Sequence, residues 1–263
     1  MSRDGAMRGD HELLMAAVRE AGELASSHFG KNTPSWMKKP GQPVSEVDLA
    51  VDDLLRQRLC DERMDYGWLS EESAETPDRM DREWLWVVDP IDGTRAFLDA
   101  RPEYSISAAL LHFNRPVAAA VFNPETDEFF EAAADSGAKC NGAPITVSAK
   151  EDTDNARVLV SRSEFKALAG DKALTPCEVN SISSIAYKLA LVGSGTTDAT
   201  VTLTTKSDWD IAAAHLIVSE AGGIMTQTDG AALVYNRPHP RHTNVLAAGP
   251  SLHAMLVMAL KEA

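Results

Sequence analysis

The sequence predicts an α/β protein with two different halves that divide near residue 150. In the first half, strand-like runs follow one another with turn residues between them, as in an antiparallel meander. In the second half, strands alternate with helices. The length of 263 residues is enough for one large domain or two small ones. We therefore expect an N-terminal α+β domain over residues 1–150 and a C-terminal α/β domain over residues 151–263.

The elements of the first half follow from apolar spacing and from capping residues. Apolar residues at helical spacing predict a helix over residues 11–29. A segment rich in Pro and Gly then predicts an irregular or strand-like connection over residues 31–44. Ser45 is a candidate N-cap for a second helix that ends near Asp65. The predicted strands of this half cover residues 84–88, 105–111, 117–122 and 128–133.

In the second half the same reasoning predicts alternating strands and helices. The predicted strands cover residues 157–161, 198–203 and 244–248. The predicted helices cover residues 164–169, 184–192 and 209–221, and a last helix runs toward the C-terminus. Gly222-Gly223 is a helix stop signal after the third of these helices.

Composition limits the classes of partner. Hydrophobic residues make up 44% of the chain and charged residues 24%, as in ordinary soluble globular proteins. The net charge of −14 argues against a nucleic-acid polymer as partner. A small phosphorylated substrate remains possible if bound cations invert the local field. Three cysteines without ligand spacing predict reduced thiols, and there is no apolar leader or membrane-length run. We expect a cytoplasmic location and no membrane partner.

The most informative motif is Asp89-Pro90-Ile91-Asp92-Gly93-Thr94, which follows the apolar run Trp84–Val88. Two carboxylates three residues apart at a strand end do not suit a hydrophobic core, but they suit a hard divalent cation beside a phosphate. Asp89 comes directly off the strand and is the expected bridge between two ions. The Ile91 carbonyl is a further candidate ligand.

The end of this motif predicts a phosphate contact. Gly93 and Thr94 would begin a helix whose free N–H groups hold phosphate oxygens. The Thr94 hydroxyl would cap that helix or orient an attacking water. A plain hairpin turn would need neither both aspartates nor the threonine.

Further acidic residues lie at element ends: Asp48 at a helix start, Glu71-Glu72 after a short apolar stretch, and Asp210 at the start of an apolar helix. Binding two or three Mg²⁺ ions requires carboxylates from separate elements. Paired ions in such a phosphatase site polarise phosphoryl oxygens and lower the pKa of a bound water. Each residue has a plainer alternative: Asp48 as a helix-end charge, Glu71 and Glu72 as solvated loop acids, and Asp210 as an N-cap.

Three histidines are weaker ligand candidates than the acidic residues. His215 lies on an apolar helix, where a packed core histidine is the plainer interpretation. His239 and His242 lie in a Pro-rich loop and are expected at the surface.

Taken together, these residues resemble the inositol monophosphatase superfamily of Mg²⁺-dependent phosphatases. Three signatures match in order, and the resemblance extends from about residue 11 to near the end of the chain. The signatures are Leu69-Ser70-Glu71-Glu72-Ser73, Trp86-Val87-Val88-Asp89-Pro90-Ile91-Asp92-Gly93-Thr94 with Phe97, and Trp209-Asp210-Ile211-Ala212-Ala213 running to Glu220-Ala221-Gly222-Gly223. Pro43-Val44-Ser45-Glu46-Val47-Asp48 is similar to a fourth.

The resemblance implies a layered αβαβα sandwich, usually dimeric, with two to three Mg²⁺ ions in each site. Glu71, Asp89 and the Ile91 carbonyl would hold one ion. Asp89, Asp92 and Asp210 would hold a second, and Glu71 with waters a weaker third. Thr94, hydrogen-bonded to Asp48, would help to activate the water that attacks phosphorus, without a phosphoenzyme. Catalytic roles thus fall on Asp48, Glu71 and Thr94, and substrate contacts on Gly93, Thr94, Lys188 and Asp210.

Two positions separate branches of the superfamily. Inositol-specific members carry a glutamate seven residues before the aspartate of the Trp-Asp motif, and this chain has Leu203 there. Lys188 falls where the 3′(2′),5′-bisphosphate nucleotidase (CysQ-like) branch places a lysine, as a second substrate phosphate would need. The alternative for Lys188 is a surface lysine on a helix. The Gly-Ser-Ser of that branch is Ser184-Ile185-Ala186 here, a departure that concerns the substrate pocket.

The expected function is a Mg²⁺-dependent phosphomonoesterase that converts 3′-phosphoadenosine 5′-phosphate to AMP and phosphate. The alternatives are an inositol-1-phosphate or broad sugar-phosphate phosphatase and, as a lesser candidate, a histidinol phosphatase. A catalytically dead, metal-binding homologue is the non-enzyme alternative. The expected partners are a small phosphorylated metabolite and a second copy of the chain.

Overall fold

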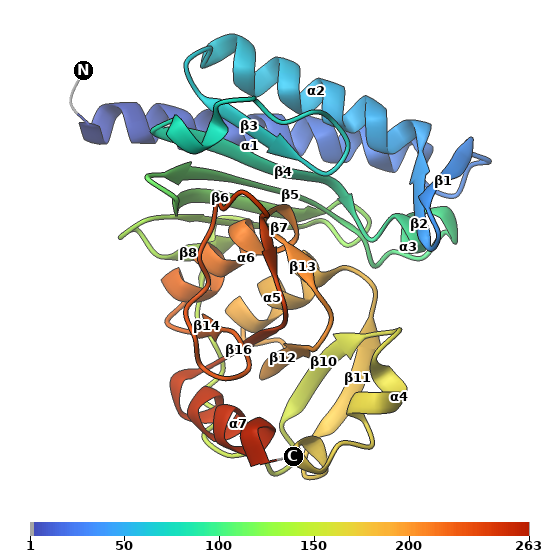
Figure 1. Cartoon of the computed structure of the whole chain (residues 1–263), viewed down its shortest axis with the longest axis vertical. Helices are drawn as coiled ribbons and strands as arrows, with labels where there is room; N and C mark the ends of the chain where they lie inside the picture. The colour runs from blue at the N-terminus through green and yellow to red at the C-terminus, as the bar shows by residue number, and fades with distance from the viewer. Residues whose placement is uncertain (1–2, 263) are drawn as a thin grey trace.

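The computed structural model describes residues 3–262, which form five stacked layers in the order αβαβα (Figure 1). Helices α1 (Arg3–His28) and α2 (Glu46–Glu62) cover one face of a seven-stranded sheet. Helices α5 (Ile185–Gly193) and α6 (Asp208–Glu220) lie between that sheet and a five-stranded one. Helix α7 (Pro250–Glu262) covers the far side of the smaller sheet. The predicted layered sandwich is confirmed.

The larger sheet has the strand order β3-β4-β5-β6-β7-β8-β9. Only β3 and β4 are parallel, and every later neighbour pair is antiparallel, as the predicted meander requires. Its strands are β3 (Gly67–Ser70), β4 (Trp84–Asp92), β5 (Ser105–His112), β6 (Arg115–Asn123), β7 (Glu128–Ala133), β8 (Ala138–Cys140) and β9 (Ala143–Ile145). The sequence did not predict β3, β8 or β9, which are only three or four residues long.

Strand β4 is apolar throughout its first half because helices cover both faces of the sheet. Leu85 and Val87 pack into the core shared with α5 and α6. Trp86 and Val88 alternate with them and pack toward α1 and α2. A strand buried on both faces has a nearly continuous hydrophobic run.

The structure extends β4 to Asp92, four residues beyond the predicted end at Val88. Asp89 pairs with Ser107 and Asp92 with Ser105, so β4 carries one extra residue between these pairs. Pro90 lies in this bulge, where a missing N–H is tolerated. A bulge bends the strand and redirects the side chains beside it.

The smaller sheet has the order β11-β10-β12-β16-β14. Strand β10 is parallel to β11 and β12, whereas β16 is antiparallel to β12 and β14. The strands are β10 (Arg157–Ser161), β11 (Glu178–Ile182), β12 (Ala199–Thr202), β14 (Ile224–Thr226) and β16 (Val245–Ala248).

The core between the sheets contains residues of both halves of the chain. Leu189 of α5 and Ile217 of α6 belong to the same buried cluster as Val87 and Val121 of the larger sheet. The two sheets divide near residue 150 in sequence, but one hydrophobic core joins them. The division into two domains stays a prediction, and its outer ends, residues 1–2 and 263, lie outside the described residues.

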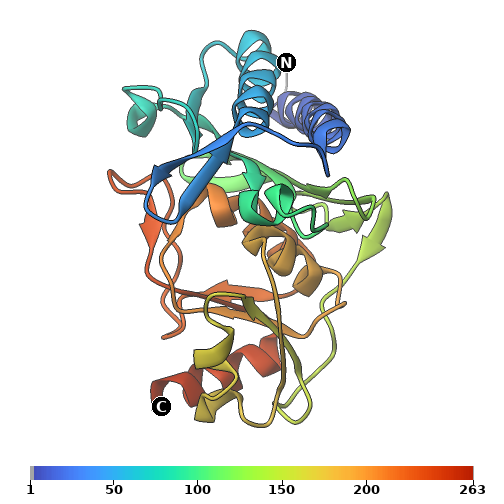
Figure 2. The same ribbon diagram turned by 90° about the vertical axis from the view of Figure 1, so that its right-hand side faces the viewer.

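A hairpin and a short helix lie at one end of the larger sheet, and the other short elements lie elsewhere (Figure 1). Strands β1 (Ser35–Lys39) and β2 (Gln42–Ser45) form a hairpin, and α3 (Thr94–Leu98) lies beside it (Figures 1 and 2). The remaining pieces are the pair β13 (Lys206–Ser207) and β15 (Arg241–His242), the short helix α4 (Phe165–Leu168), and 3₁₀ turns at Arg79–Asp81 and Lys172–Leu174. Within residues 3–262, no helix has the length and apolar character needed to cross a bilayer.

Candidate active site

Strand pairing places Glu71 beside Asp89. Because β3 and β4 are parallel, their carboxyl ends meet at the same edge of the sheet. Ser70 pairs with Val88, and the Glu71 N–H donates to the Val88 carbonyl at 3.3 Å. Glu71 follows Ser70 and Asp89 follows Val88, so the two acids are neighbours across the strands. This placement favours the prediction that Glu71 is a metal ligand over the alternative of a solvated loop acid.

Asp210 reaches the same edge from the start of α6. Ser207 is the N-cap of this helix and Asp210 is its third residue, so the two form a capping box. The Ser207 N–H donates to Asp210 Oδ2 at 2.7 Å. Asp210 is thus part of the cap without being the N-cap, and its other oxygen stays available.

A buried contact between His242 and Asp208 holds the start of α6 in place and corrects one expectation. His242 was expected at the surface, but its side chain is buried and lies 2.8 Å from Asp208 Oδ1. The antiparallel pairing of β13 with β15 brings the two residues together. His239 is exposed, as expected. His215 contacts the Tyr235 hydroxyl at 2.8 Å and does not reach the acidic group.

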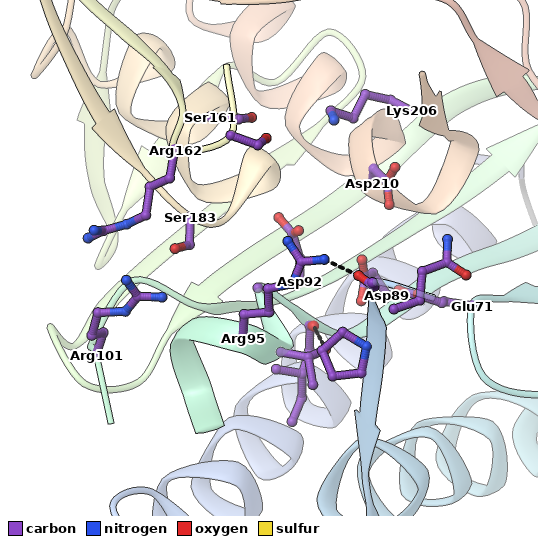
Figure 3. A pocket seen from close by; sticks show the side chains of 17 residues that line it. Glu71, Asp89, Asp92, Arg95, Arg101, Ser161, Arg162, Ser183, Lys206 and Asp210 are labelled. Carbon is purple, nitrogen blue, oxygen red and sulfur yellow. Dashed lines mark hydrogen bonds between the residues drawn. The ribbon is translucent and has the colours of Figure 1, made fainter. Parts of the chain in front are cut away.

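The three acids converge. One carboxylate oxygen from each of Glu71, Asp89 and Asp210 lies within 4.8 Å of the others, and Figure 3 shows the three side chains directed toward one another. Asp89 is only 2% exposed. Among the described residues, its Oδ1 atom has no hydrogen-bond donor. A buried carboxylate oxygen without a partner is costly, so this donor set fits a hard divalent cation.

The electrostatics of the acidic group favour a bound cation. Burial raises the pKa of Asp89 well above its ordinary value, and the neighbouring charges of Glu71, Asp92 and Asp210 raise it further. Desolvation raises the pKa of Asp210 to about 8, and Asp92 and Glu71 act in the same direction. Bound cations would reverse these shifts by favouring the ionised carboxylates.

These shifts predict how the stability of the metal-free protein depends on pH. An Asp210 pKa near 8 in the folded state, against about 3.9 in the unfolded chain, means that the folded state retains a proton that the unfolded state loses. Stability contributed by this group therefore falls as pH rises from about 4 to about 8. With a chelator present, we expect the thermal midpoint to fall between pH 5 and pH 7.

Saturating Mg²⁺ should raise the midpoint at pH 7 by about 5 to 10 °C, and by less at pH 5, where protons compete with the ion. Differential scanning fluorimetry with and without Mg²⁺, at matched ionic strength, measures this difference. An equal effect of Mg²⁺ at both pH values would contradict the assignment of these carboxylates as its ligands.

Asp92 and Ile91 lie at the same cavity but have other contacts. Asp92 is not one of the three acids whose oxygens lie within 4.8 Å of one another, and its Oδ2 atom accepts hydrogen bonds from Ser184 Oγ and from the Ala186 N–H at the start of α5. The Ile91 carbonyl accepts from Thr94 Oγ1 at 3.2 Å. Their roles as ligands stay predictions.

Thr94 is joined to Asp48, as the resemblance implied. Thr94 Oγ1 donates to Asp48 Oδ1 at 2.8 Å. The other Asp48 oxygen accepts from the Ser45 N–H at 2.8 Å and from the Ser45 hydroxyl. Ser45 is the N-cap of α2, and the capping box orients Asp48, which is 1% exposed. Its helix-end role and its link to Thr94 are therefore compatible.

Gly93 is required by the backbone at this point. It is the N-cap of α3 with φ +100°, a conformation that favours glycine. A Cβ atom here would lie 3.1 Å from the Glu103 carbonyl oxygen. Both Gly93 and Thr94 line the cavity, where free N–H groups at the helix start can meet an anion.

The cavity beside the acids has a volume of about 470 Å³, which suits a small metabolite. Figure 3 shows Arg101 and Arg162 on the side of the cavity away from Glu71. We call these two arginines the cationic end of the cavity. Arg162 is held by the Glu103 carboxylate at 2.6 and 2.7 Å.

Sequence reasoning missed the cationic end. Arg162 follows directly after β10, and Arg101 follows α3, so positions just beyond element ends were the available signal. Arg95 and Lys206 also line the cavity. Lys38, on the β1–β2 hairpin, contacts Glu71 at 3.2 Å and Glu72 at 2.6 Å.

Lys188 does not fit its predicted role as a substrate contact. Its side chain is fully buried, and it is not among the residues that line the cavity. It is not a surface lysine either. All residues of α5 are buried, and its apolar side chains pack in the core between the two sheets. Burial lowers the pKa of Lys188 to about 7, against the opposing influence of Asp92.

The chain is similar to one protein family and to phosphatases within it. Residues 10–263 match the model of the inositol monophosphatase family. The chain is 31% identical over 232 residues to an inositol-1-monophosphatase of Rhizobium meliloti, covering 83% of this chain and 85% of the relative. It is 31% identical over 225 residues to a histidinol-phosphatase of Chlorobaculum parvum, covering 82% and 85%.

Two further similarities concern proteins named SuhB. The chain is 29% identical over 232 residues to the Nus factor SuhB of Escherichia coli K12, covering 83% of this chain and 85% of the relative. The crystal structure of the extragenic suppressor protein SuhB from Bartonella henselae superimposes with a TM-score of 0.84 at 28% identity, covering 95% of this chain and 98% of that one.

Proposed function

The chain belongs to the inositol monophosphatase family, and on this premise we propose that it is a Mg²⁺-dependent phosphomonoesterase for a small substrate with a second anionic group. The observation that supports it most is the meeting of Glu71, Asp89 and Asp210 beside a cavity that also holds Gly93 and Thr94.

Different sets of residues would bind the individual Mg²⁺ ions. Glu71, Asp89 and the Ile91 carbonyl would hold one Mg²⁺, and Asp89, Asp92 and Asp210 a second, with Glu71 able to hold a weaker third. When bound, the ions would polarise the phosphoryl oxygens, lower the pKa of the attacking water and neutralise the leaving oxygen.

The side chains of the protein position the reactants. Thr94 donates its hydroxyl proton to Asp48, so the lone pairs of Thr94 Oγ1 are free to accept a hydrogen bond from the attacking water. This contact orients the water and draws its proton away from phosphorus. The N–H groups of Gly93 and Thr94 would hold the phosphate oxygens. No side chain needs to become phosphorylated.

The cationic end of the cavity favours a substrate with a second anionic group. Arg101, which pairs with Asp99 at 3.0 Å, and Arg162, which pairs with Glu103, would contact a second phosphate through their remaining N–H groups. An inositol ring would instead need a hydrogen-bond acceptor where Leu203 stands, and Leu203 cannot accept. The nearby Glu164 carboxylate accepts from the N–H groups of Leu203 and Thr204 and from the Thr202 hydroxyl, and it is not among the residues that line the cavity.

We therefore favour 3′-phosphoadenosine 5′-phosphate as substrate, giving AMP and phosphate. The alternatives are inositol 1-phosphate or a broad range of sugar phosphates, and histidinol phosphate. The names of two relatives point to inositol 1-phosphate and histidinol phosphate. Histidinol phosphate carries an ammonium group that the two arginines would repel.

A substrate panel tests this choice. The purified protein with Mg²⁺ is assayed with 3′-phosphoadenosine 5′-phosphate, inositol 1-phosphate, histidinol phosphate and p-nitrophenyl phosphate. We expect the highest kcat/KM for the bisphosphate nucleotide. Better turnover of inositol 1-phosphate would overturn the substrate, and turnover of no ester would overturn the phosphatase itself.

Arg162→Gln tests the cationic end by itself. We expect KM for the bisphosphate nucleotide to rise about 10- to 100-fold, because a hydrogen bond between charged groups is lost. The KM for p-nitrophenyl phosphate, which has no second anion, should stay the same. Arg58→Gln, on the exposed surface of α2, is the matched control. Equal losses on both substrates would contradict a contact with the second anion.

We also propose a cytoplasmic location and a homodimer. The three cysteines are free thiols, which agrees with a reducing compartment such as the cytoplasm. A homodimer is proposed from the family alone, and size-exclusion chromatography with light scattering would test it.

A further inference from the structure

Lys188 is an ionisable side chain with no exposed surface, and hydrogen bonds to the protein occupy its Nζ atom. Its Nζ atom donates to the Ile182 carbonyl at 3.2 Å, to the Ser183 carbonyl at 3.2 Å and to the Ser161 hydroxyl at 3.5 Å. An ammonium group has three N–H donors, so these contacts use all of them. None is left for a substrate phosphate.

The acceptors of Lys188 belong to the wall of the active-site cavity. Ser161 ends β10, and Ser183 lies in the turn between β11 and α5. Both residues line the cavity, and Figure 3 shows them beside Arg162. The ammonium group therefore holds together the end of β10 and the turn before α5, on the side of these segments that faces away from the cavity.

The same turn also holds Asp92 from its other side. The Ser184 hydroxyl and the Ala186 N–H both donate to Asp92 Oδ2. The turn over residues 182–186 is therefore fixed by a buried cation through its carbonyls and by a buried carboxylate through its donors. Asp92 and Lys188 have opposite charges and attract each other across the turn.

We propose that Lys188 is a positioning residue and does not bind substrate. It fixes the position of the 182–186 turn, and through that turn the positions of Asp92 and of the cavity wall at Ser161 and Ser183. A buried lysine is costly unless all its donors are satisfied, and here they are. The inference rests on the proposed phosphatase function. It differs from the expectation of direct phosphate contact drawn from the sequence.

Lys188→Met separates the two roles because it keeps the length of the side chain and removes the ammonium group. We expect kcat to fall about 10- to 100-fold, by a similar factor for the bisphosphate nucleotide and for p-nitrophenyl phosphate. The Mg²⁺ concentration for half-maximal activity should rise, since Asp92 loses its support. Lys188→Arg, which keeps charge and donors, should recover part of the loss.

Either of two kinetic results would overturn the proposal. The first is a loss confined to KM for the bisphosphate nucleotide, as a direct contact predicts and as Arg162→Gln is expected to show. The second is unchanged kinetics and unchanged Mg²⁺ dependence in Lys188→Met.

A labelling experiment on the unmodified protein needs neither a folded variant nor activity. The native protein is treated with acetic anhydride, with and without the bisphosphate nucleotide, and acetylated lysines are identified by mass spectrometry. We expect Lys188 to stay unmodified in both samples, whereas Lys206, which lines the cavity, is modified in the free protein. Modification of Lys188 that the nucleotide prevents would overturn the proposal. Failure of the phosphatase function itself would appear separately, as no turnover in the substrate panel.

Discussion

Replacing Asp89 with asparagine is expected to lower kcat/KM by about 1000-fold or more while the protein stays folded. Asp89 is buried at the centre of the acidic group, and its Oδ1 atom has no donor among the described residues. An amide has the same shape but no charge, so the site would bind a divalent cation far more weakly. Electrostatic stabilisation of a transition state commonly accounts for effects of this size.

The thermal stability of the metal-free protein should not fall in the Asp89→Asn variant, although its activity does. Burial and neighbouring acids raise the pKa of Asp89, which means that its ionised form is destabilising without a cation. In a chelator at pH 7, Asp89→Asn should melt at the same temperature as the parent protein or higher. It should also lose the stabilisation by Mg²⁺. Circular dichroism and fluorimetry measure both.

Asp53→Asn is the matched control, because Asp53 is an exposed aspartate on α2 away from the cavity. It should leave activity and the Mg²⁺ effect unchanged. If Asp89→Asn also left activity unchanged, the metal would not be catalytic. Absence of any activity in the parent protein, with Mg²⁺ binding retained, would favour the catalytically dead homologue.

The second large effect is expected for Thr94→Val. This change keeps the shape of the side chain but removes the hydroxyl that donates to Asp48 and that we propose orients the attacking water. We expect kcat to fall about 100- to 1000-fold, in the range of general acid–base and water-orienting groups. The KM should change little, because the N–H groups proposed to hold phosphate belong to the backbone.

Thr94→Ser keeps the hydroxyl and is the control for this variant. It should retain most of the activity, although the smaller side chain holds its rotamer less firmly. Initial rates for p-nitrophenyl phosphate at saturating Mg²⁺ suffice for the comparison. Similar losses in the serine and valine variants would show that packing matters here and the hydroxyl does not.

The sequence was most informative where chemistry and local structure coincide. The motif over residues 89–94 could be recognised because two aspartates and a threonine have no use in a plain turn. Ser45 and Asp48 were predicted at a helix start because a capping box has a short-range pattern. The layered fold followed from the family resemblance together with the change from meander to alternating elements.

Contacts between distant segments could not be predicted in the same way. Nothing local indicated that Asp92 would accept hydrogen bonds from Ser184 and Ala186, more than ninety positions away. His242 lies in a loop rich in Pro, yet the pairing of β13 with β15 buries it against Asp208. Such placements depend on the tertiary fold, which a single sequence does not specify position by position.

Lys188 illustrates the limit most clearly. Every residue of α5 is buried, and a lysine within so apolar a helix was a signal for burial. The resemblance instead favoured a phosphate contact, because it gave the position of the residue and not the direction of its side chain. The acceptors that satisfy the ammonium group come from β10 and from the turn before α5.

The central claim is that the carboxylates of Glu71, Asp89 and Asp210 bind catalytic divalent cations. Anomalous X-ray scattering from crystals grown with Mn²⁺ in place of Mg²⁺ tests it directly. We expect at least one strong anomalous peak at coordination distance from an Asp89 oxygen and from a second acid of this group. Anomalous peaks found only elsewhere on the protein, at a Mn²⁺ concentration that supports full activity, would contradict it.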